Sequence, residues 1–175
     1  MNIESKRVYL REIQTSDEFE MSQYLSNPKT MCFFDHGALD SDGIKALLEK
    51  KENIYPIILK ETNQIIGHFV YHPWFMVDTY EIGWVLREEY HNKGIITELA
   101  LEVLKDAFIN KSAHRVVATC QPENIPSNRV CQKIGLRQEG LFKDCIYVAR
   151  LDEWWSEVFY AMLASEYQFN QSKKV

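Results

Sequence analysis

Residues 81–108, EIGWVLREEYHNKGIITELALEVLKDAF, decide the fold because they join a strand pattern to a helix pattern through a polar turn. Before the turn the side chains alternate, with Glu81 on the face opposite Tyr80, as they do in a β-strand. After the turn, apolar residues recur at helical spacing to near residue 110. Amide groups at the start of such a helix are unpaired and carry partial positive charge, which suits a phosphate group.

The turn between these two patterns contains one glycine, Gly94. Glycine lets the backbone approach a ligand closely. His91 and Lys93 add hydrogen-bond donors, and Thr97 offers a hydroxyl one turn into the helix. The turn matches neither of the glycine-rich loops that bind nucleotide phosphates. These residues alone therefore leave two interpretations open, an ordinary turn and an anion-binding loop.

The composition is that of an ordinary globular chain: of 175 residues, 46% are apolar and 26% are charged. This length predicts one domain, residues 1–168, followed by a polar tail, residues 169–175. The formal net charge of −5 argues against a broad nucleic-acid surface. The sequence contains neither a membrane-spanning run nor a secretory signal, so we expect a cytoplasmic protein with no membrane partner.

The four cysteines, Cys32, Cys120, Cys131 and Cys145, are scattered along the chain. They form no C-x-x-C pair, which favours free thiols in a reducing compartment over a disulfide framework. Cys32 and His36 are four residues apart, but a second close pair of ligands is missing from the sequence. We therefore expect no metal site.

The rest of the chain predicts an α+β fold. We expect a mostly antiparallel, twisted sheet of about seven strands with flanking helices and one strand–helix–strand crossover. The expected strands are 7–12, two arms of a hairpin within 55–73, then 79–86, 114–121, 135–150 and 152–163, and the expected helices are 16–26, 40–51, 96–110 and 126–134.

A second polar helix start follows the strand expected at 114–121, in the stretch ENIPSNRVCQKIGLRQEG, residues 123–140. Asn124 and Ser127 flank this start, and Gly135 ends the helix. A capped helix with a glycine stop explains each residue taken singly. It does not explain why two neighbouring strands both end at a polar helix start.

Taken together, these motifs resemble the GNAT acyltransferase superfamily, and within it the branch of ribosomal-protein-alanine N-acetyltransferases. The resemblance covers almost the whole chain, and its turn differs from the family pattern at His91 and Ile96. It implies the GNAT fold, with a V-shaped coenzyme A cleft between the fourth and fifth strands. The motifs that carry it are RVYLRE at 7–12, IIGH at 65–68, YEIGWVL at 80–86, HNKGIITEL at 91–99 and NIPSNRVCQKIGLRQEG at 124–140.

The resemblance also implies a binding site for acetyl-coenzyme A. The pyrophosphate would rest on the amides of residues 91–96, the pantetheine arm would pair with the backbone of Val85 and Leu86, and Asn124 would bond the arm. Ile96 is bulkier than the family residue, and helical spacing lets it point into the core. The implied coenzyme-binding residues are Trp84, Val85, Leu86, His91, Asn92, Lys93, Gly94, Ile95, Ile96, Thr97 and Asn124, with Asn128 and Arg129 near the adenosine end.

For catalysis the resemblance implies Glu81 as the base that takes the amine proton and Ser127 as the acid that protonates the leaving thiolate. Helix capping by Ser127 is the alternative. Cys131 occupies the position of the superfamily's usual tyrosine, and we expect its thiol near the coenzyme's sulfur. Tyr147 and Tyr160 are further candidates for the acid, although aromatic residues in strands more often belong to the core.

Aromatic residues interleaved with acidic ones predict the wall that holds the acceptor amine, through cation–π and charge contacts. We expect Phe33, Phe34 and Trp154 there, and a lid packed on its own core is the alternative. The implied activity is transfer of acetyl from acetyl-coenzyme A to a primary amine, such as a protein N-terminal α-amine. An antibiotic or polyamine acceptor, a coenzyme-binding sensor without turnover, and a homodimer all remain open.

Overall fold

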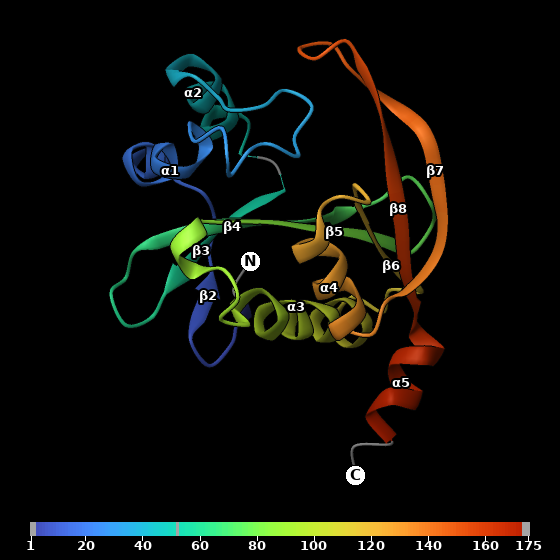
Figure 1. Ribbon diagram of the computed structural model, residues 1–175. Coiled ribbons are helices and arrows are strands. Elements are labelled where there is room, and N and C mark those ends of the chain that lie inside the picture. The colour runs from blue at the N-terminus through green and yellow to red at the C-terminus, as the bar shows by residue number, and fades with distance from the viewer. Residues whose placement is uncertain (1–2, 52, 173–175) are drawn as a thin grey trace.

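The computed structural model describes residues 3–51 and 53–172. These residues contain one eight-stranded sheet and the helices that flank it (Figure 1). The strand order is β1-β2-β3-β4-β5-β6-β8-β7, and within the described residues only β5 and β6 pair in parallel. The strands are β1 (Ile3–Glu4), β2 (Val8–Leu10), β3 (Ile54–Leu59), β4 (Ile65–Pro73), β5 (Thr79–Leu86), β6 (Arg115–Cys120), β7 (Arg137–Val148) and β8 (Glu153–Leu163).

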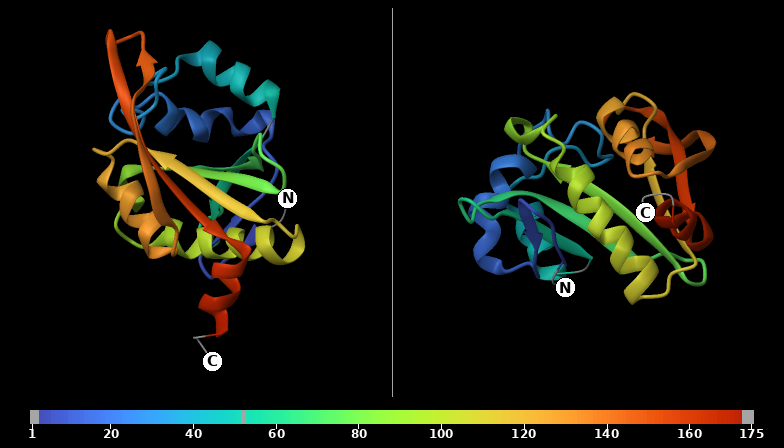
Figure 2. Two further views of the ribbon diagram at one scale, coloured as in Figure 1. Left: turned by 90° about the vertical axis from the view of Figure 1, so that its right-hand side faces the viewer. Right: turned by 90° about the horizontal axis from the view of Figure 1, so that it is seen from below.

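Helices cover both faces of this sheet (Figure 2), with α1 and α2 on one face and α3 and α4 on the other. Among the described residues, none of the helices has the length and apolar character that crossing a membrane requires. The α-helices are α1 (Glu18–Leu25), α2 (Ser41–Lys50), α3 (Ile95–Lys105), α4 (Ile125–Lys133) and α5 (Ala164–Ser172), and the shorter turns are η1 (Thr15–Asp17), η2 (Glu88–Tyr90) and the π-helical η3 (Asp106–Asn110).

The α+β class expected from the sequence is confirmed, and each expected element is present within a few residues of its expected bounds. Besides the short turn η2, two elements were not expected. The strand β1 has two residues, too few to show alternation. The helix α5 extends into the expected polar tail, whose last residues, 173–175, lie outside the described residues.

Strand alternation divides the apolar side chains between two core clusters, one on each face of the sheet. Ile82 of β5 packs with Val103 of α3 in the larger cluster. Val85 of the same strand packs with Leu48 of α2 in the smaller one. Residues at even spacing from Val85 therefore face the side of the sheet that carries α1 and α2, and Glu81 is one of them.

The two parallel strands separate soon after they pair. Thr79 lies opposite Arg115 and Glu81 opposite Val117, and no pairing follows Glu81. Beyond that point β5 stays paired only with β4, as far as Leu86. A V-shaped gap thus opens between β5 and β6 where the resemblance implied a cleft.

The hydrogen-bond pattern of β5 determines which backbone groups face this gap. At the two ends of the β4–β5 ladder, the amide of Arg87 donates to Ile66 and the amide of Trp74 donates to the carbonyl of Thr79. Antiparallel ladders alternate bonded and non-bonded pairs. Val85 therefore exchanges its backbone bonds with β4, so the expectation that its backbone pairs with a ligand arm is wrong. The amide and carbonyl groups of Trp84 point into the gap instead.

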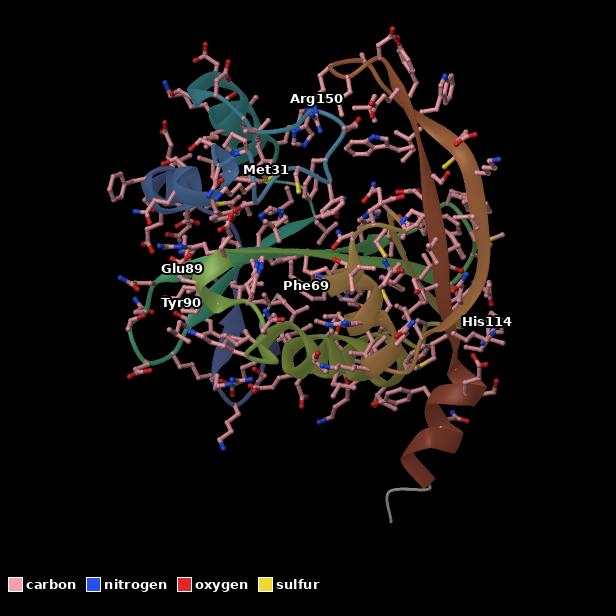
Figure 3. All side chains as sticks on the ribbon, in the orientation of Figure 1. Met31, Phe69, Glu89, Tyr90, His114 and Arg150 are labelled. Carbon is pink, nitrogen blue, oxygen red and sulfur yellow. The ribbon has the colours of Figure 1, made fainter. Side chains whose placement is uncertain are left out.

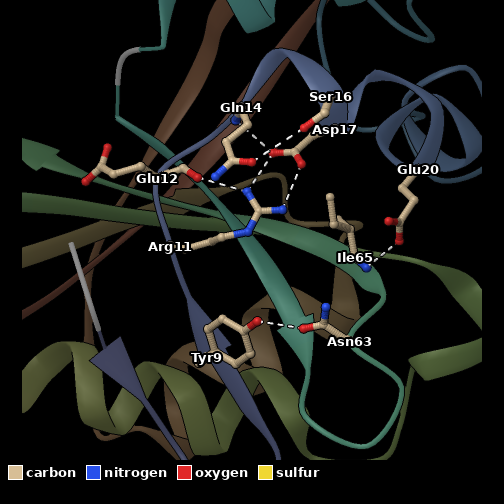
Figure 4. A network of polar contacts seen from close by, with 9 residues as sticks. All are labelled: Tyr9, Arg11, Glu12, Gln14, Ser16, Asp17, Glu20, Asn63 and Ile65. Atoms are coloured by element: carbon tan, nitrogen blue, oxygen red, sulfur yellow. Dashed lines mark hydrogen bonds and ion pairs between the residues drawn. The ribbon is translucent and has the colours of Figure 1, made fainter.

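A polar network fixes the chain where it passes from β2 into α1 (Figure 4). Asp17 is almost completely buried, and its carboxylate accepts two hydrogen bonds from Arg11, both of 2.7 Å. The same carboxylate accepts a 2.8 Å bond from the amide of Gln14. From α1, Glu20 accepts a 2.7 Å bond from the amide of Ile65, at the start of β4. These bonds hold α1 against the sheet, together with the segment that precedes it.

Candidate active site

Two adjoining hollows occupy the gap between β5 and β6. The acidic hollow, of about 400 Å³, contains Asp35, Glu81 and Glu157 in its walls and neither lysine nor arginine. The basic hollow, of about 280 Å³, contains Lys29, Arg129 and Lys133 and neither aspartate nor glutamate. The two hollows share one set of walls, formed by Phe33, Phe34, Trp84, Val85, Asn124 and Ser127.

The polar turn before α3 forms one end of the basic hollow. Gly94 has a φ of 72°, in the left-handed region, and it directly precedes the first residue of α3. A side chain added there would meet no atom closer than 3.8 Å, the distance from its Cβ to Nη2 of Arg7. Gly94 and the first residues of α3, whose amides have no partner within the helix, line the basic hollow together with Arg129 and Lys133.

Hydrogen bonds from neighbouring elements hold this turn in place. Nε2 of His91 donates to the carbonyl of Leu86 at 2.8 Å, so its ring ties the turn to the end of β5. Arg7 donates to the carbonyl of Lys93 at 2.9 Å and to the carboxylate of Glu98 at 2.8 Å. Because these bonds come from the chain itself, the turn keeps its shape without a ligand.

At the start of α4, the roles of two polar residues separate. The Oδ1 atom of Asn124 accepts a 3.3 Å hydrogen bond from the amide of Ser127, so Asn124 caps the helix. Ser127 lies in the walls of both hollows. Its hydroxyl has no hydrogen-bond partner in the part of the chain that the structure describes. Asn124, and not Ser127, therefore caps the helix, which removes the capping role that was the alternative for Ser127.

The floor of the acidic hollow is one face of the sheet. Glu81 and Glu157 lie on this face, as do His72 of β4 and Thr119 of β6. Nε2 of His72 lies 3.4 Å from the carboxylate of Glu81, and the hydroxyl of Thr119 donates to Glu157 at 3.3 Å.

Both carboxyl groups on the floor are weaker acids than an exposed glutamate. Burial raises the pKa of Glu81, and His72 partly opposes this. Burial also raises the pKa of Glu157, against the hydrogen bond from Thr119, and the negative charge of Glu81 raises it further. The raised pKa makes the carboxylate of each residue a better proton acceptor than that of an exposed glutamate.

The roof of the acidic hollow is the loop between α1 and α2. Arg150, in the turn between β7 and β8, donates to the carbonyls of Cys32, Phe34 and Asp35 at 3.1–3.2 Å. Its guanidinium also lies 5.4 Å from the ring centre of Trp155. Arg150 thus bridges the loop and the hairpin above the floor, as its place in Figure 3 shows.

Comparison with known proteins supplies the family. The model of the acetyltransferase (GNAT) domain matches residues 7–137. The chain belongs to the GNAT acetyltransferase family. It is 40% identical to the uncharacterized N-acetyltransferase YnaD of Bacillus subtilis, over 95% of this chain and 99% of that protein.

Solved structures agree with this assignment. The crystal structure of a GNAT-family acetyltransferase from Bacillus anthracis is 39% identical, with a TM-score of 0.90 over 95% of this chain and 100% of that one. The ribosomal-protein-S5-alanine acetyltransferase from Vibrio fischeri shares the fold, with a TM-score of 0.75 at 20% identity over 95% and 98% of the two chains. This GNAT protein is an N-acetyltransferase, and its family takes acetyl groups from acetyl-coenzyme A.

Most residues expected to bind the coenzyme in this acetyltransferase line the basic hollow. Ile96 lines it and also packs in the core, as helical spacing allowed. Lys93 does not line the hollow: its ammonium lies 5.3 Å from the ring centre of Tyr90. Asn128 also lies outside, because its side chain holds the β6–α4 turn through bonds to Gln121 and Asn124 and accepts one from Tyr160. Those that line the hollow are Trp84, Val85, Leu86, His91, Asn92, Gly94, Ile95, Ile96, Thr97, Asn124 and Arg129.

Two expectations are wrong: that Trp154 forms part of the acceptor wall, and that the thiol of Cys131 lies near the coenzyme's sulfur. Trp154 is 60% exposed and lies 5.3 Å from Tyr147, outside both hollows, and Trp155 lines the acidic hollow instead. Cys131 is completely buried in the core, whereas the thiol in the wall of the acidic hollow is that of Cys120.

Tyr147 and Tyr160, the two further candidates for the acid, line neither hollow. Tyr160 is buried in the core, and Tyr147 is exposed and bonded to Asp152. Sequence reasoning also missed Glu157, although alternation along β8 places it on the same face as Trp155. In the described ranges no group of three or more histidine, cysteine or acidic residues is arranged to hold a metal ion.

Proposed function

We propose that this acetyltransferase binds acetyl-coenzyme A in the basic hollow and a primary amine in the acidic hollow, and transfers the acetyl group directly between them. The observation that carries the proposal is the separation of charge. The coenzyme's phosphates are anionic and an amine is cationic before it reacts, so each fits the hollow of opposite charge. The walls that the hollows share, Ser127 among them, are then the place of transfer.

The residues of the basic hollow fit the coenzyme. The open side of Gly94 and the unpaired amides at the start of α3 suit the pyrophosphate, and Arg129 and Lys133 add positive charge. The backbone of Trp84 faces the gap with free hydrogen-bonding groups, which suits the amides of the pantetheine arm. When bound, acetyl-coenzyme A supplies an acyl group activated as a thioester.

Glu81 acts as the base in this proposal. It lies where β5 and β6 part, at the floor of the acidic hollow, and its raised pKa makes its carboxylate a better proton acceptor. A neutral amine attacks the acetyl carbon, a carbon–nitrogen bond forms, the carbon–sulfur bond breaks, and the amine's proton goes to Glu81 directly or through water. Positioning of the two reactants supplies much of the rate.

Ser127 acts as the acid. Its hydroxyl is free of the helix cap and lies in the walls of both hollows, so it suits donation of a proton to the leaving thiolate. Solvent then carries the proton from Glu81 back to Ser127, which closes the cycle with one amide and one thiol formed. A thiol has a pKa of about 8.5, so the thiolate needs little help to leave at neutral pH.

The experiment that tests this proposal measures thiol release from acetyl-coenzyme A with a panel of amines, including short peptides with a free N-terminal α-amine. Calorimetry of coenzyme binding accompanies it. Amine-dependent release of thiol supports the proposal. Tight coenzyme binding with no turnover on any amine contradicts it and supports a sensor role instead.

A further inference from the structure

Glu157 is a second carboxylate in the acidic hollow that the chemistry of transfer does not use. It lies on β8, across β6 from Glu81, and both side chains line the same hollow. Its one hydrogen bond among the described residues comes from the neutral hydroxyl of Thr119. No lysine or arginine of the described chain lies within 4.0 Å of it. A half-buried carboxylate without a cationic partner is costly for the protein alone.

The surroundings of Glu157 suit a cation from outside. Trp155, two residues earlier on the same strand, lines the hollow with the Arg150 guanidinium near its ring, and Asp35 contributes a further acidic group from the roof. Aromatic faces and carboxylates together bind ammonium groups. A single acceptor amine needs only Glu81, and its proton neutralises only that carboxylate. Arg150 donates to backbone carbonyls of the roof and to neither of these carboxylates, so the hollow keeps an excess of negative charge that calls for a second positive charge on the acceptor.

We propose that the acceptor is a small diamine or longer polyamine, whose reacting amine lies at Glu81 while its second ammonium group binds Glu157. This inference rests on the proposed function and makes Glu157 the residue that determines specificity. It leaves Glu81 and Ser127 in their roles and assigns Glu157 no proton transfer.

The roof favours a small acceptor over a protein chain. Arg150 joins the α1–α2 loop to the β7–β8 turn through three hydrogen bonds, so the hollow is bridged on its outer side. Gly37, in the same loop, leaves only 3.0 Å between a built Cβ and Nε of Arg150, so the two segments are closely packed. A hollow of about 400 Å³ holds a flexible diamine, whereas an extended peptide needs an open groove.

The test compares matched amines of equal chain length, with diaminobutane set against butylamine and diaminohexane against hexylamine. A charge-assisted hydrogen bond to Glu157 should give the better diamine a kcat/KM at least about tenfold above its monoamine, after correction for its two equivalent amino groups. In Glu157→Gln this preference should fall close to one, chiefly through KM, while coenzyme affinity stays unchanged. Glu153→Gln is the matched control, because Glu153 is exposed on the same strand and lines neither hollow; it should keep the preference.

Each other outcome overturns the inference in a distinguishable way. Turnover of both amines with equal kcat/KM, or a diamine preference that survives in Glu157→Gln, removes Glu157 from acceptor recognition and leaves the proposed function intact. The inference is also overturned, with the proposed function intact, if a peptide with N-terminal alanine and no basic side chain has a higher kcat/KM than every diamine. Failure of all amines and peptides to release thiol contradicts the proposed function itself.

Discussion

Replacing Glu81 by Gln tests the base assignment with almost no change of shape. Gln keeps the size of the side chain and its contact with the His72 ring, 3.4 Å away, but it cannot accept a proton at neutral pH. Coenzyme binding, which depends on the basic hollow, should not change, because Glu81 does not line it. The loss should therefore appear in turnover.

The size of the loss follows from how well the site excludes water. General bases typically contribute about 10²–10⁴-fold. The Glu81 side chain is 27% exposed, so solvent reaches it and takes over part of its role. We therefore expect the lower end, about a hundredfold in kcat/KM, which corresponds to about 2.7 kcal/mol of transition-state stabilisation.

The assay is thiol release at saturating acetyl-coenzyme A across a pH series, for wild type and Glu81→Gln. The ratio of the two rates should be largest above the raised pKa of Glu81 and below the pKa of the amine, where a base is both available and needed. It should shrink at lower pH as the carboxylate takes up a proton. Glu153→Gln, which removes an exposed carboxylate, should match wild type throughout.

Equal turnover of Glu81→Gln and wild type over the whole pH range would refute the reasoning and remove Glu81 from the mechanism. A hundredfold loss accompanied by an equal loss of coenzyme affinity would also refute it, because Glu81 would then act through the shape of the cleft.

Three further predictions concern the turn, the acid and the core. Gly94→Asp should raise the Kd for coenzyme A at least about tenfold, because a carboxylate would oppose the pyrophosphate, whereas Gly94→Asn, which tolerates a φ of 72°, should lose much less affinity by calorimetry. Ser127→Ala should lower kcat about tenfold while coenzyme affinity and Tm stay unchanged, because Asn124 caps the helix; unchanged kcat per folded molecule would leave the proton to water. Burial lowers the pKa of His68 to about 4, against about 6.5 in the unfolded chain. The free energy of unfolding should therefore fall by up to about 3 kcal/mol as the pH is lowered from 6.5 to 4, and denaturant titrations of His68→Gln should show a weaker dependence on pH.

Much of the fold could be predicted from the sequence because its signals are local. Alternation along β5 correctly set Glu81 against Tyr80, and the glycine turn before α3 marked the helix start. Helical spacing also allowed Ile96 to point into the core, where it packs. A strand as short as β1, whose two residues pair with the neighbouring β2, is too brief to show alternation.

The acceptor side of the site was harder to predict because it is assembled from distant segments. Which of Trp154 and Trp155 lines the hollow depends on the phase of β8, and that phase is set by its pairing with β6. The bridge from Arg150 to Phe34 joins segments 116 residues apart, so no local pattern announces it. Glu157 was missed for the same reason, although its strand was correctly placed.

The most direct test of the account is whether the acetyl group passes straight from coenzyme to amine where the two hollows meet. Initial velocities measured while both substrates are varied should give intersecting lines, and intact-protein mass spectrometry after incubation with acetyl-coenzyme A alone should find no acetylated protein. Parallel lines, together with an acetyl group on Cys120 in the wall of the acidic hollow, would contradict direct transfer and show a covalent route instead.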